Sequence, residues 1–334
     1  MTAARIGATL LLVLAVVASV GWVLWRVDLA AAAEALAAAG PLALGAALVA
    51  SAASIVLRTF RLQAMLPTRL GWADAFVVMC IGSLATSFVP LRMGELARPY
   101  VLADRHGVTL GESLGTIVVE RFLDVCALLA LLALTGWAAE GVAVVDVGGM
   151  DLLAAGLALS RVVAVGGLTV LVLLVVLGER GVAVVERTLG LVSTGLAERV
   201  AGQVRGLVEV ARTLARSPLR LAIAVLTTAA TWAAAVGMTW CVVQAFPGLP
   251  AGLDLVLLFW SACITSMTLL PSPGFVGTFD AAGLAALLVL GVASGPAGAA
   301  AVTLHVVMLL PVVVLGLGAT LKVGVGLRSL VRER

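Results

Sequence analysis

Charged residues are scarce in this sequence. Only 12% of the 334 residues are Asp, Glu, Lys or Arg, aromatic residues make up 5%, and tyrosine occurs once. Soluble domains carry about a quarter charged residues, so this composition excludes an ordinary soluble globular protein. The hydrophobic share is 62% and the mean hydropathy is +1.19, which is typical of an integral membrane protein.

The sequence also lacks the common patterns of catalytic and metal sites. It has no Gly-rich nucleotide loop, no zinc-ligand spacing and no Ser/His/Asp set in a loop long enough to hold a catalytic domain. Cys80, Cys126, Cys241 and Cys263 lie in apolar runs, where buried bulk is a better interpretation than a disulfide framework. We therefore expect no catalytic residue, no metal, no cofactor, no enzymatic activity and no nucleic-acid partner.

Apolar runs long enough to cross a hydrocarbon core of about 30 Å recur along the chain. They are Ile6–Trp25, Pro41–Leu57, Gly115–Trp137, Arg161–Leu177, Leu219–Phe246 and Pro296–Leu321. The first run has an alternative interpretation as a signal peptide, because Arg5 precedes it and small residues follow it. Its length, and the tryptophans Trp22 and Trp25 at its end, favour a membrane span.

Two segments between the runs are expected to be amphipathic helices. Asp28–Ala39 is rich in alanine, with Asp28 as its N-cap and Gly40-Pro41 at its end. Glu179–Arg216 is too charged to cross a membrane, but its apolar residues recur every three or four positions. We expect this helix, or broken pair of helices, to lie on the membrane or beneath the bundle. Ser217-Pro218 then forms the N-cap and first turn of the next span.

Two further apolar segments are interrupted. Trp72–Val89 ends at Pro90-Leu91-Arg92-Met93-Gly94-Glu95-Leu96-Ala97-Arg98, and Gly252–Leu270 ends at Pro271-Ser272-Pro273-Gly274-Phe275-Val276-Gly277. The first interruption is either a short cytoplasmic loop or a broken helix at membrane depth, where ionisable groups mark a pathway.

The distribution of basic residues separates two topologies. If every apolar run crosses once, there are nine spans, and the bases of Glu179–Arg216 lie opposite the cluster Arg58, Arg61 and Arg69, against the positive-inside rule. If residues 72–112 and 252–292 are instead re-entrant, about six spans remain and both termini are cytoplasmic. In this second topology, the three arginines after Leu57 are a basic exit from the second span.

The sequence therefore predicts an all-α polytopic membrane protein with about six full spans and two re-entrant helical hairpins. Residues 1–334 form a single membrane domain, with residues 1–137 and 138–334 as two inverted halves and amphipathic cytoplasmic helices at residues 179–216. Inverted repeats whose helices break at matching positions indicate a transport site near the midplane. Irregular backbone persists at that depth only where protein or a water-filled cavity satisfies it.

The charged residues at the first break predict the binding of an anionic headgroup. Arg92 and Arg98 are expected to hold a phosphate, assisted by the amide groups of a half-helix N-terminus. Glu95 either balances one of these arginines or binds a cationic group itself.

Three more charges, Glu120, Arg121 and Asp124, cover one turn near the start of the run Gly115–Trp137. They are either paired with one another at membrane depth or placed at the interface, where their ends reach water.

The second break has fewer charges. Gly274 and Gly277 allow the chain to turn and to approach a partner closely. Asp280 either carries a proton, meets an arginine of the first hairpin, or is a helix N-terminal carboxylate stabilised by the dipole. No titratable group lies one turn from His305, so a satisfied core histidine is favoured over a proton relay.

Three motifs, in order, resemble those of one family. They are Pro90-x-Arg92-x-Gly94-Glu95-x-x-Arg98, then Glu120-Arg121-x-x-Asp124, then Pro273-Gly274-Phe275-Val276-Gly277-Thr278-Phe279-Asp280. The sequence resembles the lysylphosphatidylglycerol synthase membrane-domain family, also called flippase-like membrane proteins, which has Pro-x-Arg-x-Gly-Glu-x-x-Arg, Glu-Arg-x-x-Asp and Pro-Gly-Gly-x-Gly-x-x-Glu. Phe275 stands where the family has its second glycine, and Asp280 stands for its glutamate.

The resemblance implies a polytopic domain with re-entrant helices that moves lipids between leaflets. It implies roles for Arg92, Glu95, Arg98, Glu120, Arg121 and Asp124, and less directly for Asp280. It is also the sole ground for a homodimer. The aminoacyl-transfer domain of the fused enzymes is not seen, so we expect a stand-alone member without lysyl transfer.

The expected function is therefore a flippase-like lipid translocase of the cell membrane. Its substrate would be a phospholipid or polyprenyl-phosphate-linked lipid whose headgroup carries phosphate. Two alternatives stay open. One is a non-transporting partner that anchors a lipid-modifying or glycosyl-transferring enzyme through residues 179–216, and the other is a small-solute or ion transporter.

Overall fold

The computed structural model describes residues 20–21, 23–89, 94–138, 194–269 and 272–323, and the single positions 169, 183 and 187. Every regular element in these ranges is a helix, which confirms the predicted all-α class. The elements are α2 (Leu29–Ala37), α3 (Pro41–Met65), α4 (Trp72–Phe88), α5 (Ala97–His106), α6 (Leu110–Ala138), α9 (Thr194–Ala215), α10 (Pro218–Ala245), α11 (Leu253–Leu269), the 3₁₀ helix η2 (Pro273–Phe275), α12 (Thr278–Val289) and α13 (Ser294–Val323).

Local sequence signals set several helix ends. The Asp28 carboxylate accepts hydrogen bonds from the backbone amides of Ala30 and Ala31 at 3.0 and 3.1 Å, and so caps α2. Pro41 opens α3 after Gly40, and Pro218 opens α10 after the N-cap Ser217. Proline suits these first positions because it has no amide hydrogen to leave unsatisfied. The caps predicted from sequence are thus confirmed.

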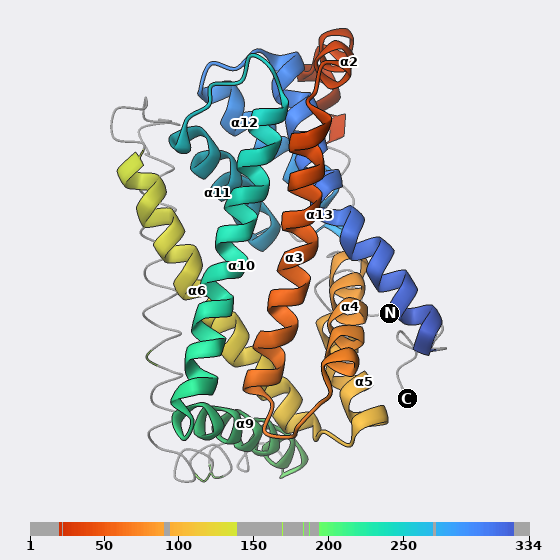
Figure 1. The fold of residues 1–334 in the computed structure, drawn as a ribbon. Coiled ribbons are helices and arrows are strands. Elements are labelled where there is room, and N and C mark those ends of the chain that lie inside the picture. The colour runs from red at the N-terminus through yellow and green to blue at the C-terminus, as the bar shows by residue number, and fades with distance from the viewer. Residues whose placement is uncertain are drawn as a thin grey trace.

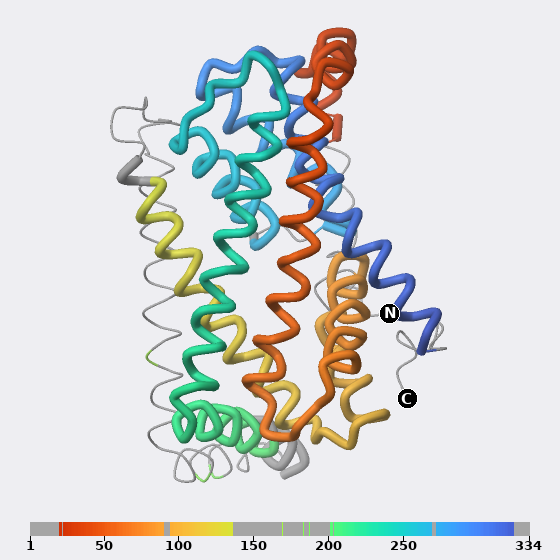
Figure 2. Tube along the Cα trace, in the orientation of Figure 1, coloured from red at the N-terminus to blue at the C-terminus, as the bar shows by residue number. Residues whose placement is uncertain are grey.

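Three described helices, α3, α10 and α13, are long and apolar enough to cross a membrane. Of these, α3 and α10 run side by side along the length of the molecule (Figure 1; Figure 2). The apolar helices α4, α11 and α12 are shorter. Membrane-spanning helices are therefore present, as predicted. Most of the expected spans Ile6–Trp25 and Arg161–Leu177 lies outside the described residues, so the number of spans stays a prediction.

The shorter apolar helices lie toward opposite ends of the molecule. In Figure 1, α4 and α5 lie toward the end occupied by α9, whereas α11 and α12 lie toward the end occupied by α2. Among the described helices, α2 and α4 pack on α13, and α9 and α11 pack on α6. The re-entrant hairpins and the inverted repeat stay predictions.

Glycines permit the close approach of each amphipathic helix. A Cβ atom on Gly115 of α6 would lie 2.7 Å from the carbonyl oxygen of Gly206 on α9, and a Cβ on Gly295 of α13 would lie 2.5 Å from the Ala31 side chain on α2. Small residues at such crossings let helix backbones approach, which is how membrane helices gain packing contacts.

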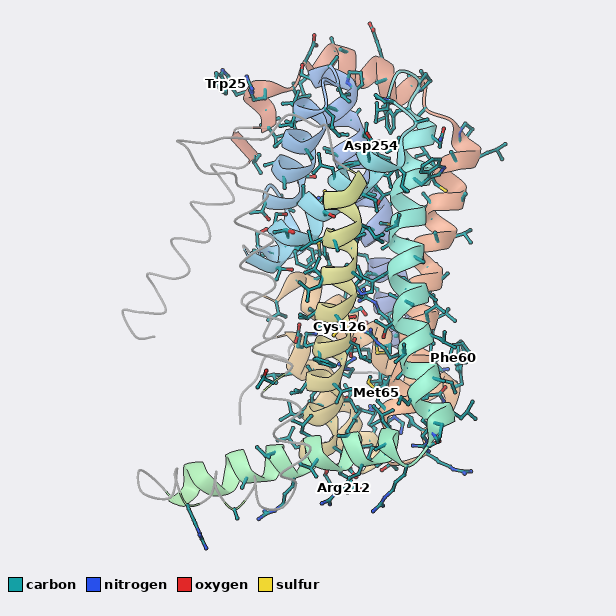
Figure 3. The ribbon with its side chains drawn as sticks, turned by 90° about the vertical axis from the view of Figure 1, so that its left-hand side faces the viewer. Trp25, Phe60, Met65, Cys126, Arg212 and Asp254 are labelled. Atoms are coloured by element: carbon teal, nitrogen blue, oxygen red, sulfur yellow. The ribbon has the colours of Figure 1, made fainter. Side chains whose placement is uncertain are left out.

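The helix α9 covers part of the predicted amphipathic segment. Its apolar side, with Leu207, Val210 and Leu214, packs with Met65 and Val119 in one buried cluster. In Figure 3, α9 runs across one end of the bundle, and Arg212 points away from the bundle. This confirms an amphipathic helix beneath the bundle over residues 194–215; most of the rest of the predicted segment lies outside the described ranges.

Candidate functional site

A cavity of about 290 Å³ lies where the two breaks meet. It is lined by residues of α3, α4, α6, α10, α11 and α13, together with Glu95 and Arg98 after the first break and Phe275 in the second. The 3₁₀ helix η2 packs on α4. Two irregular segments that are far apart in the sequence therefore border one internal space.

The cavity wall is amphipathic. Its hydroxyl-bearing residues are Ser51, Ser54, Ser83, Thr86, Ser87, Thr231 and Thr268, and its methionines are Met79, Met238, Met267 and Met308. Flexible methionine side chains fill irregular space and tolerate different apolar partners. Such a wall can hold a polar group at one place and an apolar chain at another.

Arg61 on α3 is at the centre of the buried charges. Its guanidinium contacts Glu120 at 2.6 Å and Asp124 at 2.7 Å, and it also donates to the Thr228 hydroxyl at 3.2 Å. Arg61 is 1% exposed, and the Glu120 side chain is 3% exposed. Buried charges are tolerated when they are paired and hydrogen-bonded, and this fork-shaped contact provides both.

Two more arginines surround the same carboxylates. Arg98 Nη1 lies 2.6 Å from Glu120 Oε2 and 3.3 Å from the sulfur of Met79. Arg121 is more loosely placed, with Nη2 at 3.7 Å from both Glu120 and Asp124 and a side chain that is 42% exposed. Asp124 also accepts a hydrogen bond from the indole of Trp232 at 3.4 Å.

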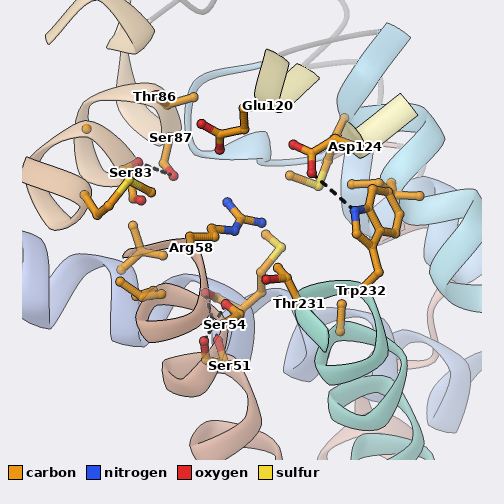
Figure 4. Close-up of a pocket in the computed structure, with 18 of the residues that line it drawn as sticks. Ser51, Ser54, Arg58, Ser83, Thr86, Ser87, Glu120, Asp124, Thr231 and Trp232 are labelled. Atoms are coloured by element: carbon orange, nitrogen blue, oxygen red, sulfur yellow. Dashed lines mark hydrogen bonds between the residues drawn. The ribbon is translucent and has the colours of Figure 1, made fainter. Parts of the chain in front are cut away.

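Arg58 differs from these arginines. It lines the cavity, and no carboxylate lies within ion-pair distance of it in the described part of the chain. Figure 4 shows its side chain extending from α3 into the space bordered by Ser87, Glu120 and Asp124. Arg58 therefore presents a cation to the cavity.

These positions correct the sequence interpretation of the arginines after Leu57. Arg58 and Arg61 are not a basic exit to the cytoplasm, because both lie inside the bundle. The signal that could have shown this is the continuation of the helix: Leu62 and Met65 follow the arginines and are 1% and 0% exposed. Apolar residues beyond a charge place that charge within a span rather than after it.

The cluster on α6 is paired, which settles one alternative left open by the sequence. Glu120 and Asp124 are held by arginines inside the protein and do not extend to a membrane surface. Their main partner is Arg61 on α3, 59 residues from Glu120, and Arg121 on their own helix contributes longer contacts. Pairing was one of the two alternatives that the sequence left open, and Arg61 was not its expected partner.

Asp280 and His305 form a second polar pair, away from the cavity wall. The Asp280 carboxylate accepts a hydrogen bond from the Gly277 amide at 3.0 Å, so it caps α12, as one of the sequence alternatives proposed. His305 Nδ1 lies 2.9 Å from Asp280, and His305 Nε2 lies 2.7 Å from the carbonyl oxygen of Gly274. The Gly274 carbonyl oxygen can only accept, so the hydrogen bond between it and His305 is donated by Nε2. His305 is therefore a core histidine with a hydrogen-bond partner for each ring nitrogen, and one of these partners, Asp280, is itself titratable.

The second break owes its shape to left-handed backbone. Gly274 and Gly277 have φ angles of 62° and 80°, which suit glycine, and Phe275 has the unusual value of 57°. Phe275 lines the cavity, whereas Gly274, Gly277 and Asp280 do not. The glycines thus set the path of the backbone at the break.

The predicted site residues separate into two places. Glu95, Arg98, Glu120, Arg121 and Asp124 come together at the cavity. Gly274, Gly277 and Asp280 lie with His305 at the second break. Arg92 is outside the described residues. Within the described ranges, no three Asp, Glu, His or Cys side chains are grouped closely enough to hold a metal ion.

An all-helical bundle with spanning helices and a buried, charged cavity defines a helical membrane protein. The chain belongs to the family described as the lysylphosphatidylglycerol synthase TM region, whose model matches residues 9–316. This family ties the chain to the handling of membrane lipids. Comparisons with curated proteins and with solved structures found no match.

Proposed function

We propose that this protein is a lipid translocase that moves a lipid with a phosphate-bearing headgroup between membrane leaflets. The observation that carries the proposal is the cavity between the two breaks, which combines arginine side chains with an apolar and hydroxyl-bearing wall. Charged groups are costly at membrane depth and occur there mainly where they serve a pathway. The family's link to lipid handling agrees with this use.

The proposed topology has six spans and two re-entrant hairpins in an inverted repeat. The matched contacts of α2 with α13 and of α9 with α6 support it, as do the opposite ends toward which α4 and α11 are displaced (Figure 1). In such repeats, a central site opens to one side and then the other as one half moves against the other. We further propose a cell-membrane location with both termini cytoplasmic.

The headgroup would cross while the acyl or prenyl tails stay in the bilayer. Moving a charged headgroup through hydrocarbon is expensive because its water shell is lost. Arginines and hydroxyls that replace water lower this barrier. Glu120 and Asp124 keep the arginines from holding an anion too tightly, since each carboxylate competes with the headgroup for the same guanidinium groups.

Leaflet-to-leaflet movement in liposomes tests the proposal. Purified protein is reconstituted with labelled phospholipids or polyprenyl-phosphate lipids, and the fraction of label that becomes accessible outside is followed over time. We expect movement by the wild type and strong slowing by Glu95→Gln and Arg92→Ala. Arg69→Gln is the matched control, because Arg69 is exposed and away from the cavity.

No movement of any lipid by folded protein would reject the translocase. Copurification of a stoichiometric lipid-modifying or glycosyl-transferring enzyme would then favour an anchoring role, and uptake of a solute without lipid movement would favour a solute or ion transporter. A homodimer, expected from the family, is tested by the mass of the protein in detergent. No catalytic activity is proposed for this chain.

A further inference from the structure

Arg58 is the one cavity arginine in the described part of the chain that no carboxylate holds within 4 Å. Arg98 contacts Glu120 at 2.6 Å, and Arg121 lies 3.7 Å from both Glu120 and Asp124. Arg58 lines the same cavity without such a contact; its buried Nε has no hydrogen-bond partner, as is also true of Arg61 and Arg121. A buried cation without a counter-charge is unfavourable unless another anion joins it.

The surroundings of Arg58 suit an oxyanion. Ser83 and Thr86 of α4 present hydroxyl-bearing side chains to the same cavity, and Thr231 of α10 adds another. Figure 4 shows these residues on different sides of the Arg58 guanidinium. A guanidinium can hold two oxygens of a phosphate in a fork, and hydroxyls can donate to the remaining oxygens.

We propose that Arg58 is the anion-binding residue of the cavity and holds the phosphate oxygens of a lipid headgroup. This proposal rests on the proposed lipid translocation for its choice of a lipid, and it assigns the anion to a residue outside the family-like motifs. Arg98 then has a different role, because it holds Glu120 in place beside the site.

Direct binding tests the assignment without requiring transport. The thermal stabilisation of purified protein in detergent is titrated with short-chain phosphatidylglycerol, which is a singly charged phosphodiester lipid. Short-chain phosphatidylcholine, short-chain phosphatidic acid and inorganic phosphate are titrated in parallel. We expect phosphatidylglycerol to bind, and Arg58→Gln to weaken its binding about tenfold or more.

Two further variants keep the result interpretable. Arg58→Lys retains the charge but loses the fork, so we expect intermediate binding. Arg69→Gln makes the same substitution at an exposed arginine just after α3, and it should leave binding unchanged. Unaltered affinity in folded Arg58→Gln overturns the assignment. Binding of inorganic phosphate without binding of any of the three lipids overturns the choice of a lipid headgroup.

Liposome transport separates this proposal from the proposed function. If phosphatidylglycerol binding depends on Arg58 while no lipid crosses the bilayer, the anion site stands and the translocase fails. If lipid crosses and Arg58→Gln alters neither its rate nor the preference among headgroups, the translocase stands and the Arg58 site fails.

Discussion

Arg58 and Arg61 lie three residues apart on α3, yet only Arg61 is enclosed by carboxylates. Arg61 contacts Glu120 at 2.6 Å and Asp124 at 2.7 Å, whereas Arg58 faces the cavity. One helix therefore supplies a structural arginine and, in our proposal, a ligand-binding arginine. Stability measurements can distinguish these roles, because only the charge of Arg61 is neutralised by carboxylates of the protein itself.

Arg61→Gln should strongly destabilise the protein. The change leaves two buried carboxylates without their main counter-charge, and breaking a buried pair from one side costs about 3–5 kcal/mol. Thermal or denaturant unfolding in detergent gives the difference in unfolding free energy. Arg69→Gln, at an exposed position, serves as the control and should differ by less than about 0.5 kcal/mol. A small loss in Arg61→Gln would mean that Arg98 and Arg121 neutralise both carboxylates without it.

Arg58→Gln should give the opposite result in the absence of ligand. The wild-type guanidinium has no carboxylate within ion-pair distance among the described residues, so its removal relieves a desolvated cation. We expect an unfolding free energy within about 1 kcal/mol of the wild type, or higher. A loss as large as that of Arg61→Gln would contradict the view that Arg58 has no structural counter-charge.

Arg98 and Glu120 should be energetically coupled. Their side chains are 8% and 3% exposed and contact each other at 2.6 Å. In a double-mutant cycle with Arg98→Gln and Glu120→Gln, we expect a coupling energy of about 1–3 kcal/mol. The same cycle with Arg69→Gln in place of Arg98→Gln should be additive. Additivity in both cycles would show that the close contact contributes nothing measurable.

Local features of the fold could be predicted from the sequence because they depend on neighbouring residues. Asp28, Pro41 and Ser217-Pro218 mark helix starts through capping and proline geometry, and the structure has helices starting there. The apolar period of residues 185–214 likewise indicated an amphipathic helix, which α9 confirms in part. These signals lie within a few residues of what they determine.

The pairing of distant charges could not be predicted in the same way. Arg61 and Glu120 are 59 residues apart, and Asp280 and His305 are 25 residues apart on different helices. Helical periodicity gives the face of a residue on its own helix but not the helix that the face meets. The sequence therefore identified Glu120, Asp124 and Asp280 as candidates, and failed to identify Arg58 and Arg61 as residues of the site.

The contact between α6 and α9 gives a prediction with a control one turn away. A Cβ atom on Gly206 would overlap the backbone of Gly111, whereas a Cβ on Gly202 would meet nothing within 4 Å. Gly206→Ala should therefore reduce the unfolding free energy by about 1–3 kcal/mol. Gly202→Ala should leave it unchanged or raise it by about 0.5–1 kcal/mol, because alanine favours the helix. Equal effects would show that α9 does not dock on α6 at Gly206.

Phe275 combines backbone strain with a buried ring, and the magnitudes decide which dominates. Its φ of 57° costs a non-glycine residue about 1–2 kcal/mol, a cost that Phe275→Gly removes. The same change deletes a ring that is 8% exposed in the main core cluster, and losing a buried phenylalanine costs about 3–5 kcal/mol. We therefore expect Phe275→Gly to lower the unfolding free energy by about 2–3 kcal/mol, the loss being larger than the relief. Phe275→Leu keeps the strain and most of the apolar bulk, and should lose less. If Phe275→Gly is as stable as the wild type in detergent unfolding, the strain at this break equals the packing of the ring, and glycine is as good a residue here as phenylalanine.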